Sequence, residues 1–274
     1  SNVLIKSLDI DRTIIDDRLE YYKSIPQPVQ KSKEWLAQRY SFITASIFSV
    51  AIKSKYNTAR IELLKEKVSC GSYRPFVGND ATRWGEKYEP MANAIYEWRN
   101  GVKLHEYGLI PHSDTNVFFI GASTDGVSSN LINCEIKWPV SRQIKTGSIK
   151  QEYYYQILTQ LEVMDLPLSH FLECKFAEHT EENFWEDFYY VPNCDSNDLE
   201  KPDMNAEKGC IIEYTDKNSN GDRQAFLYSP IFWSVRTRKI SKGVGREWLD
   251  LTTGKLGQIR IRAALRSRPA PVSY

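Results

Sequence analysis

Residues 119–139 read FIGASTDGVSSNLINCEIKWP, and this stretch decides the fold that we expect for the chain. It predicts a strand, a turn at Asp125-Gly126, a loop and a second strand over 131–138. Side chains alternate between the two faces of a strand, so the apolar residues of the second strand share one face: Ile132, Cys134, Ile136 and Trp138. The opposite face carries Asn133, Glu135 and Lys137. We therefore expect one packed apolar face and one charged face that looks into a site.

An aspartate on a turn, with a glutamate and a lysine two residues apart on the adjoining strand, is typical of metal-dependent nucleases. Asp125 and Glu135 would hold Mg²⁺, a hard cation that prefers oxygen ligands. Lys137 would orient or deprotonate a water that attacks a phosphodiester. The alternative is structural, because Asp-Gly is a common hairpin turn and Glu-x-Lys is usually a solvated cross-strand pair. A motif this short also occurs by chance.

Composition is that of an ordinary globular chain. The 274 residues are 41% hydrophobic and 26% charged, which fits one large domain or a core with an appended subdomain. No apolar run reaches the roughly 18 residues that span a bilayer, and the N-terminus has no signal-peptide pattern. We expect no membrane partner and a cytoplasmic location, or a nuclear one in a eukaryotic host. Five scattered cysteines without CxxC spacing favour neither disulfides nor a zinc site.

The net charge of +1 hides an uneven distribution. Residues 233–274 contain two acids, Glu247 and Asp250, against ten basic residues: Arg236, Arg238, Lys239, Lys242, Arg246, Lys255, Arg260, Arg262, Arg266 and Arg268. A segment this basic suits a polyanion. A solvated helix face is the alternative.

Apolar spacing and capping signals predict helices over 33–39, 44–53, 58–68, 80–99 and 148–165. The helix over 80–99 has the clearest signal, a continuous apolar stripe formed by Trp84, Tyr88, Met91 and Ile95. Strands are predicted over 103–110, 116–120, 169–176 and 225–238, and a basic helix over 244–265. Helices followed by a mixed sheet with a helix across it indicate an α/β or α+β fold.

Four signatures along the chain resemble the phage lambda exonuclease family, the YqaJ-type viral recombinases of the PD-(D/E)xK nuclease superfamily. The first is Trp35 and Arg39 followed by ITAS at 43–46, and the second is WGEKYE at 84–89. The third is STDG at 123–126 with EIKWP at 135–139, and the fourth is a helix with Gln156 and Gln160. Together they span about residues 33–165. Their order and spacing are more specific than any single motif.

The resemblance implies a restriction-endonuclease-like core, a central mixed β-sheet flanked by helices, with a C-terminal extension. The proline-containing stretch SIPQPVQ at 24–30 indicates an N-terminal arm over 1–32 that leads into the nuclease core over 33–176. The resemblance does not explain the chain beyond this core, and we expect residues 177–274 to be an extension packed on the same domain. The resemblance also implies direct Mg²⁺ ligands in Asp125, Glu135 and the backbone carbonyl of Ile136. Glu89 would hold a second Mg²⁺ or its waters, and Mn²⁺ is a possible substitute for both ions. A solvated helix glutamate near Lys87 or Asn93 is the alternative for Glu89.

The family carries a glutamine-bearing helix, but the sequence leaves open whether Gln156 or Gln160 is the active-site glutamine, because Leu158 stands where a second glutamine is common. Gln156 would hydrogen-bond near Lys137 or the attacking water. Thr124 replaces a proline that is usual in the family. Arg39 and Ser46 are similar to the family's pocket for a 5′-terminal phosphate, although Arg39 could instead pair with Glu34 and Ser46 could be an interior helix serine.

The function that the resemblance implies is a Mg²⁺-dependent 5′→3′ exonuclease, encoded by a virus or phage. It would digest linear double-stranded DNA from 5′-phosphorylated ends and leave 3′ single strands for DNA recombination and repair. A ring-like homo-oligomer and a single-strand annealing protein are the implied partners. The alternatives are a PD-(D/E)xK endonuclease of different specificity and a non-catalytic DNA-binding or scaffold protein.

Overall fold

The structure is a computed structural model, and it describes residues 10–28, 32–53, 57–73, 80–139, 142–144, 147–176, 178–179, 209–216, 223–229, 260–264 and 272–273. The helices are α1 Arg12–Ser24, α2 Lys33–Ser41, α3 Ala45–Lys53, α4 Asn57–Val68, α5 Asp80–Asn100 and α6 Gln151–Met164, with a 3₁₀ turn η1 at Thr115–Val117. The strands are β1 Ile43–Thr44, β2 Leu104–His105, β3 Ile110–Pro111, β4 Ile120–Ala122, β5 Gly126–Ser128, β6 Ile132–Lys137, β7 Leu168–Glu173, β8 Glu178–His179, β9 Gly209–Asp216, β10 Arg223–Tyr228, β11 Arg260–Ala264 and β12 Val272–Ser273.

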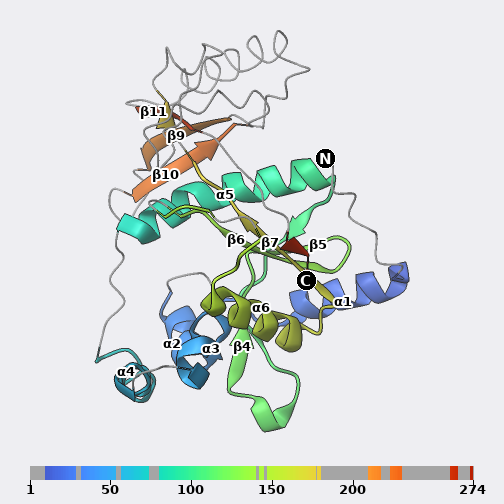
Figure 1. The fold of residues 1–274 in the computed structure, drawn as a ribbon, viewed down its shortest axis with the longest axis vertical. Coiled ribbons are helices and arrows are strands. Elements are labelled where there is room, and N and C mark those ends of the chain that lie inside the picture. The colour runs from blue at the N-terminus through green and yellow to red at the C-terminus, as the bar shows by residue number, and fades with distance from the viewer. Residues whose placement is uncertain are drawn as a thin grey trace.

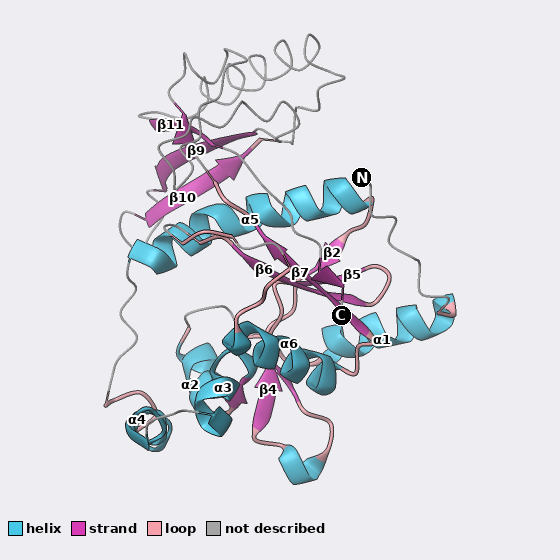
Figure 2. Ribbon diagram, in the orientation of Figure 1, coloured by secondary structure: helices cyan, strands magenta, loops and turns pink. Residues whose placement is uncertain are grey.

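A mixed sheet lies at the centre of the molecule, in the order β12-β7-β6-β5-β2 (Figures 1 and 2). β6 pairs in parallel with β7 and antiparallel with β5. Helix α5 covers one face of this sheet and α6 lies on the other (Figure 1). The predicted α/β fold with a mixed sheet flanked by helices is therefore confirmed.

One core lies between α5 and the central sheet. The stripe predicted on α5 is buried, because Tyr88, Met91 and Ile95 pack against Cys134 and Ile136 of β6. At about 25 cal/mol per Å² of apolar surface, side chains of this size each stabilise the fold by roughly 1.5–3 kcal/mol. Because the apolar face of β6 packs against α5, the polar face of β6 points away from that helix.

Proline interrupts α5 in its interior at Pro90. Proline has no N–H, so the carbonyl four residues earlier, that of Glu86, loses its helical partner. Tyr228 of β10 supplies a replacement, since its hydroxyl donates to the Glu86 carbonyl at 3.3 Å. A second link comes from β8, where Glu178 accepts from Lys87 at 2.5 Å and from Tyr88 at 2.7 Å. The four-stranded sheet β10-β9-β11-β8 thus contacts α5 through both of these strands.

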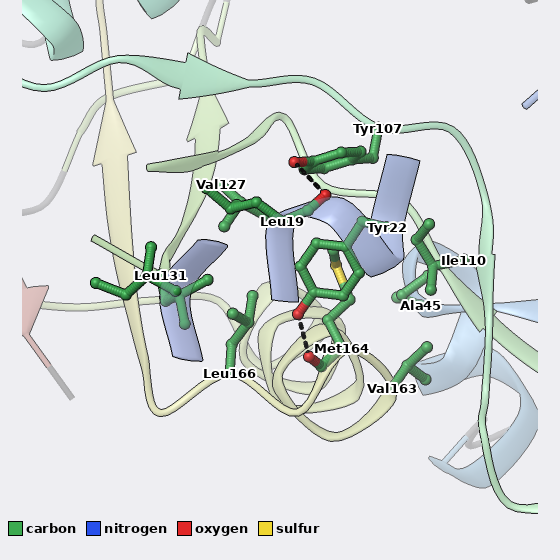
Figure 3. Packing of buried hydrophobic residues seen from close by; sticks show 12 residues of the cluster. Leu19, Tyr22, Ala45, Tyr107, Ile110, Val127, Leu131, Val163, Met164 and Leu166 are labelled. Atoms are coloured by element: carbon green, nitrogen blue, oxygen red, sulfur yellow. Dashed lines mark hydrogen bonds between the residues drawn. The ribbon is translucent and has the colours of Figure 1, made fainter. Parts of the chain in front are cut away.

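A second core joins α1 to the end of α6, and Figure 3 shows its packing. Ile15, Leu19 and Tyr22 of α1 are buried, and the Tyr22 hydroxyl donates to the Met164 carbonyl. Arg18 pairs with Asp165 at 2.5 Å, just past the last turn of α6. The segment expected to be an arm therefore contains a packed helix that covers the C-terminus of α6.

Other predicted elements differ from the structure. The strand expected over 116–120 is wrong for its first part, because the Asp114 carboxylate accepts from the Asn116 amide and the chain forms η1 before β4 begins. The helix expected over 244–265 is wrong at its end, where residues 260–264 form β11 and pair with β9. Most of the basic segment 233–274 lies outside the described residues. The domain boundaries at 32 and 176 stay predictions.

Candidate active site

The polar face of β6 looks toward α6. Glu135 is fully buried on this face, and its neighbour Lys137 is one quarter exposed. The Lys137 ammonium contacts Glu135 Oε1 and lies 4.0 Å from Oδ2 of Asp125, in the bend before β5. One ammonium therefore contacts one carboxylate and lies near the second. The contact of Lys137 with Glu135 agrees with the alternation, which placed both side chains on one face of the strand. A solvated cross-strand pair does not describe this arrangement, because Glu135 has no exposed surface.

Asp125 is held against the strand that carries Glu135. Its Oδ2 atom accepts a hydrogen bond from the Ile136 backbone N–H at 2.6 Å. Its carbonyl accepts from Nδ2 of Asn93 on α5 at 3.4 Å. Burial, together with the negative charge of Glu135, raises the pKa of Asp125 to about 8. Two carboxylates so close together disfavour each other's charge, and a bound cation relieves this repulsion.

The same two carboxylates stabilise the charged form of Lys137. Burial lowers the pKa of this lysine, but the charges of Glu135 and Asp125 outweigh that effect and raise the pKa above its ordinary value. The side chain is therefore an ammonium that donates hydrogen bonds. Its ammonium also lies 5.5 Å from the ring centre of Tyr153 on α6. Tyr153 packs on Phe171 as well, so its ring is part of the wall of the site.

Both candidate glutamines of α6 contact Glu135. Gln156 Nε2 donates to Glu135 Oε1 at 2.7 Å, and Gln160 Nε2 donates to Oε2 at 2.6 Å. Residues four apart lie on one face of a helix, which explains why the sequence could not separate them. Leu158, by contrast, points outward and is 43% exposed. The sequence did not reveal that the two amides take one oxygen each.

Glu89 approaches the site from α5. Burial and the nearby carboxylates of Glu106 and Glu135 raise the pKa of Glu89, while Lys137 opposes them. The side chains proposed as its structural partners have other contacts, because Lys87 pairs with Glu178 and Asn93 donates to Glu106 at 2.9 Å. Glu89 thus lies within the electrostatic field of Glu135 and Lys137. Glu106 was not identified from the sequence, where it carries no motif.

The donor set fits a divalent cation, although it is not arranged as a preformed metal site. Among the described residues, no three acidic, histidine or cysteine side chains are gathered closely enough to hold a metal ion. Glu135 Oε1 is instead occupied by Lys137 and Gln156. Two buried oxygens beside Asp125, Thr124 Oγ1 and Asn93 Oδ1, have no partner in the described structure. The waters that Mg²⁺ retains are donors of the kind these oxygens need.

Arg39 and Ser46 lie on neighbouring helices. The Arg39 guanidinium lies 5.4 Å from the ring centre of Trp35, and no ion pair joins Arg39 to Glu34 among the described residues. Ser46 is in the first turn of α3, where its hydroxyl lies 3.2 Å from that of Thr44. No hydrogen bond between Arg39 and Ser46 occurs in the described part of the chain. Helix α3, which carries the exposed Ser46, packs along α6.

Comparison with known proteins agrees with the predicted resemblance. Residues 34–167 match the family described as the YqaJ-like viral recombinase domain. The uncharacterized protein R354 of Acanthamoeba polyphaga mimivirus is 39% identical in an alignment that covers 88% of this chain and 47% of R354. The chain thus spans about half the length of this relative.

No helix among the described residues could cross a membrane.

Two solved structures are similar to part of the chain. The alkaline exonuclease LHK-Exo from Laribacter hongkongensis is 30% identical, with a TM-score of 0.47, over 53% of this chain and 74% of that one. LHK-Exo in complex with dAMP is 29% identical, also with a TM-score of 0.47, over 52% of this chain and 74% of that one.

Proposed function

We propose that this chain, in which residues 34–167 form a YqaJ-like viral recombinase domain, is a Mg²⁺-dependent exonuclease. It digests linear duplex DNA 5′→3′ from phosphorylated ends and leaves 3′ single strands for recombination. The main support for this proposal is the position of the Lys137 ammonium between two carboxylates. It contacts Glu135 and lies 4.0 Å from Asp125. Two carboxylates that can bind a metal ion, beside a lysine that can donate a hydrogen bond, are the groups needed for metal-assisted hydrolysis of a phosphodiester.

Each residue has a chemical role in this proposal. Asp125, Glu135 and the Ile136 carbonyl would hold the first Mg²⁺, and Glu89 would hold a second ion or its waters. Bound Mg²⁺ supplies the Lewis acidity that activates the phosphodiester and a water. Lys137 donates to the attacking water or to a phosphate oxygen and so orients it. Gln156, which is only half-buried, positions the same water.

The test is a cleavage assay on DNA with defined ends. Linear duplexes with 5′-phosphate should be degraded in Mg²⁺ or Mn²⁺ and spared in EDTA, while covalently closed circles of the same sequence stay intact. Cleavage of the circles would instead assign an endonuclease. Inactivity on every substrate with both metals, with DNA binding retained, would assign a scaffold. The implied ring and annealing protein belong to the proposal and need separate measurements of mass and of co-purification.

We expect Arg39 and Ser46 to bind the 5′-terminal phosphate and so to select the DNA end. A guanidinium and the N–H groups at a helix start bind phosphate well. Arg39→Ala should therefore reduce the preference for 5′-phosphate over 5′-hydroxyl ends by about tenfold, equal to about 1.4 kcal/mol. Arg12→Ala, on the exposed side of α1, is the matched control. An Arg39→Ala enzyme with an unchanged preference refutes the pocket.

A further inference from the structure

Gln160 is a fully buried amide at the site. Its relative exposure is 0%, although it lies on α6 only one turn after the half-buried Gln156. Burying an amide costs free energy unless its donors and acceptor are satisfied. The partners of Gln160 therefore decide what it contributes.

Both hydrogens of the Gln160 amide have acceptors. Nε2 donates to Glu135 Oε2 at 2.6 Å and to the backbone carbonyl of Ser123 at 3.0 Å. Ser123 lies two residues before Asp125, in the same loop. One side chain thus ties the carboxylate of β6 to the loop that carries the other carboxylate.

The orientation of this amide is fixed by Asn133, a second residue of β6, which is in turn bonded to β7. Asn133 of β6 donates from Nδ2 to Gln160 Oε1 at 3.1 Å and to Ser169 Oγ of β7 at 2.8 Å. A flipped Gln160 would turn its carbonyl oxygen toward the Glu135 carboxylate and the Ser123 carbonyl, where acceptors would face acceptors. The hydrogen bond from Asn133, whose amide is itself held by Ser169, therefore keeps Gln160 in the one orientation that serves Glu135.

Gln156 has a different environment. It donates to Glu135 Oε1, the oxygen that Lys137 also contacts, and it retains exposed surface. Its amide can exchange this bond for one to water or substrate. Gln160 cannot do so, because its amide is enclosed.

We propose that Gln160 is a positioning residue that sets the separation of Glu135 from the Asp125 loop, and with it the affinity of the site for a divalent cation. The inference rests on the proposed function. A purely structural role would not need this network, because well-packed apolar side chains of similar volume often replace buried polar groups without loss of stability. Side chains that orient metal ligands typically contribute about 10–100-fold to metal affinity or activity.

The experiment compares Gln160→Met with Gln156→Met, two substitutions of the same type one turn apart. Mn²⁺ affinity is measured by EPR without DNA, and kcat, KM for DNA and melting temperature are measured beside it. Gln160→Met should raise the Mn²⁺ dissociation constant by about tenfold or more, leave KM for DNA unchanged, and recover kcat at saturating metal. Gln156→Met should lower kcat at every metal concentration and shift Mn²⁺ affinity less than about threefold.

A Gln160→Met protein that binds Mn²⁺ as tightly as the wild type overturns the proposal. So does a loss of kcat that saturating metal does not restore. If Gln160→Met fails to fold, Ser169→Ala serves instead, because it removes the hydrogen bond between Ser169 and Asn133. This variant should also weaken Mn²⁺ binding, by a smaller factor. Unchanged Mn²⁺ binding in Ser169→Ala also overturns the proposal. A wild-type protein that binds no Mn²⁺ would refute the proposed function itself, which separates the two failures.

Discussion

The two faces of β6 are both buried, yet they are built from opposite chemistry. Cys134 and Ile136 pack against α5, whereas Glu135 accepts from the two amides of α6 and contacts Lys137. The apolar face stabilises the fold through contacts that need only shape and volume. The polar face sets a carboxylate and a lysine, beside the carboxylate of Asp125, in a low-dielectric environment that is unfavourable for folding unless the charges are paired. Substitutions on the two faces should therefore have different consequences.

The largest effect is expected on the polar face. Lys137→Met retains much of the side-chain volume but removes the donor beside Glu135 and Asp125. Turnover should fall by about 10²–10⁴-fold, the usual contribution of a positioned proton donor or acceptor, while DNA binding is retained. Steady-state cleavage and DNA affinity measured on the same preparation check this. Turnover within tenfold of the wild type would remove Lys137 from the mechanism.

The apolar face should respond in stability instead. Ile95→Ala, on the side of α5 that packs against β6, should reduce the free energy of unfolding by about 2–5 kcal/mol. The cleavage rate per folded molecule should change by less than about threefold. Urea denaturation gives the first quantity and an active-site titration the second. A loss of turnover in the folded fraction would show that the two faces are coupled.

A smaller effect is expected where α5 meets β10. Tyr228→Phe leaves the Glu86 carbonyl without the hydroxyl that compensates for Pro90, at a cost of about 0.5–1.5 kcal/mol. Pro90→Ala restores the helical N–H, so in that background the same substitution should cost less. A double-mutant cycle by urea denaturation measures the difference. Equal costs in both backgrounds would show that the hydroxyl does not replace the missing helical bond.

Much of this comparison could be predicted from the sequence. Alternation along 131–138 assigned the side chains of β6 to two faces, and the stripe from Trp84 to Ile95 predicted α5 and its packing. The spacing of Ile15, Leu19 and Tyr22 is also that of a helix, whereas the proline-containing stretch that follows it indicates an arm.

What the sequence could not reveal depends on contacts between distant segments. Gln156 and Gln160 share a helix face, so only the position of Glu135 shows that each binds a different oxygen. Residues 260–264 have a helical pattern in isolation, but pairing with β9 makes them a strand. The pairing of Lys87 with Glu178 joins residues far apart in the chain and has no local signature.

Diffraction from crystals soaked in Mn²⁺ would show whether the polar face of β6 is a divalent-cation site. An anomalous difference map should show a Mn²⁺ peak in contact with Asp125 and Glu135, and Glu135→Gln should abolish it. A map with no peak at these two carboxylates, at a Mn²⁺ concentration that supports cleavage, would contradict the account.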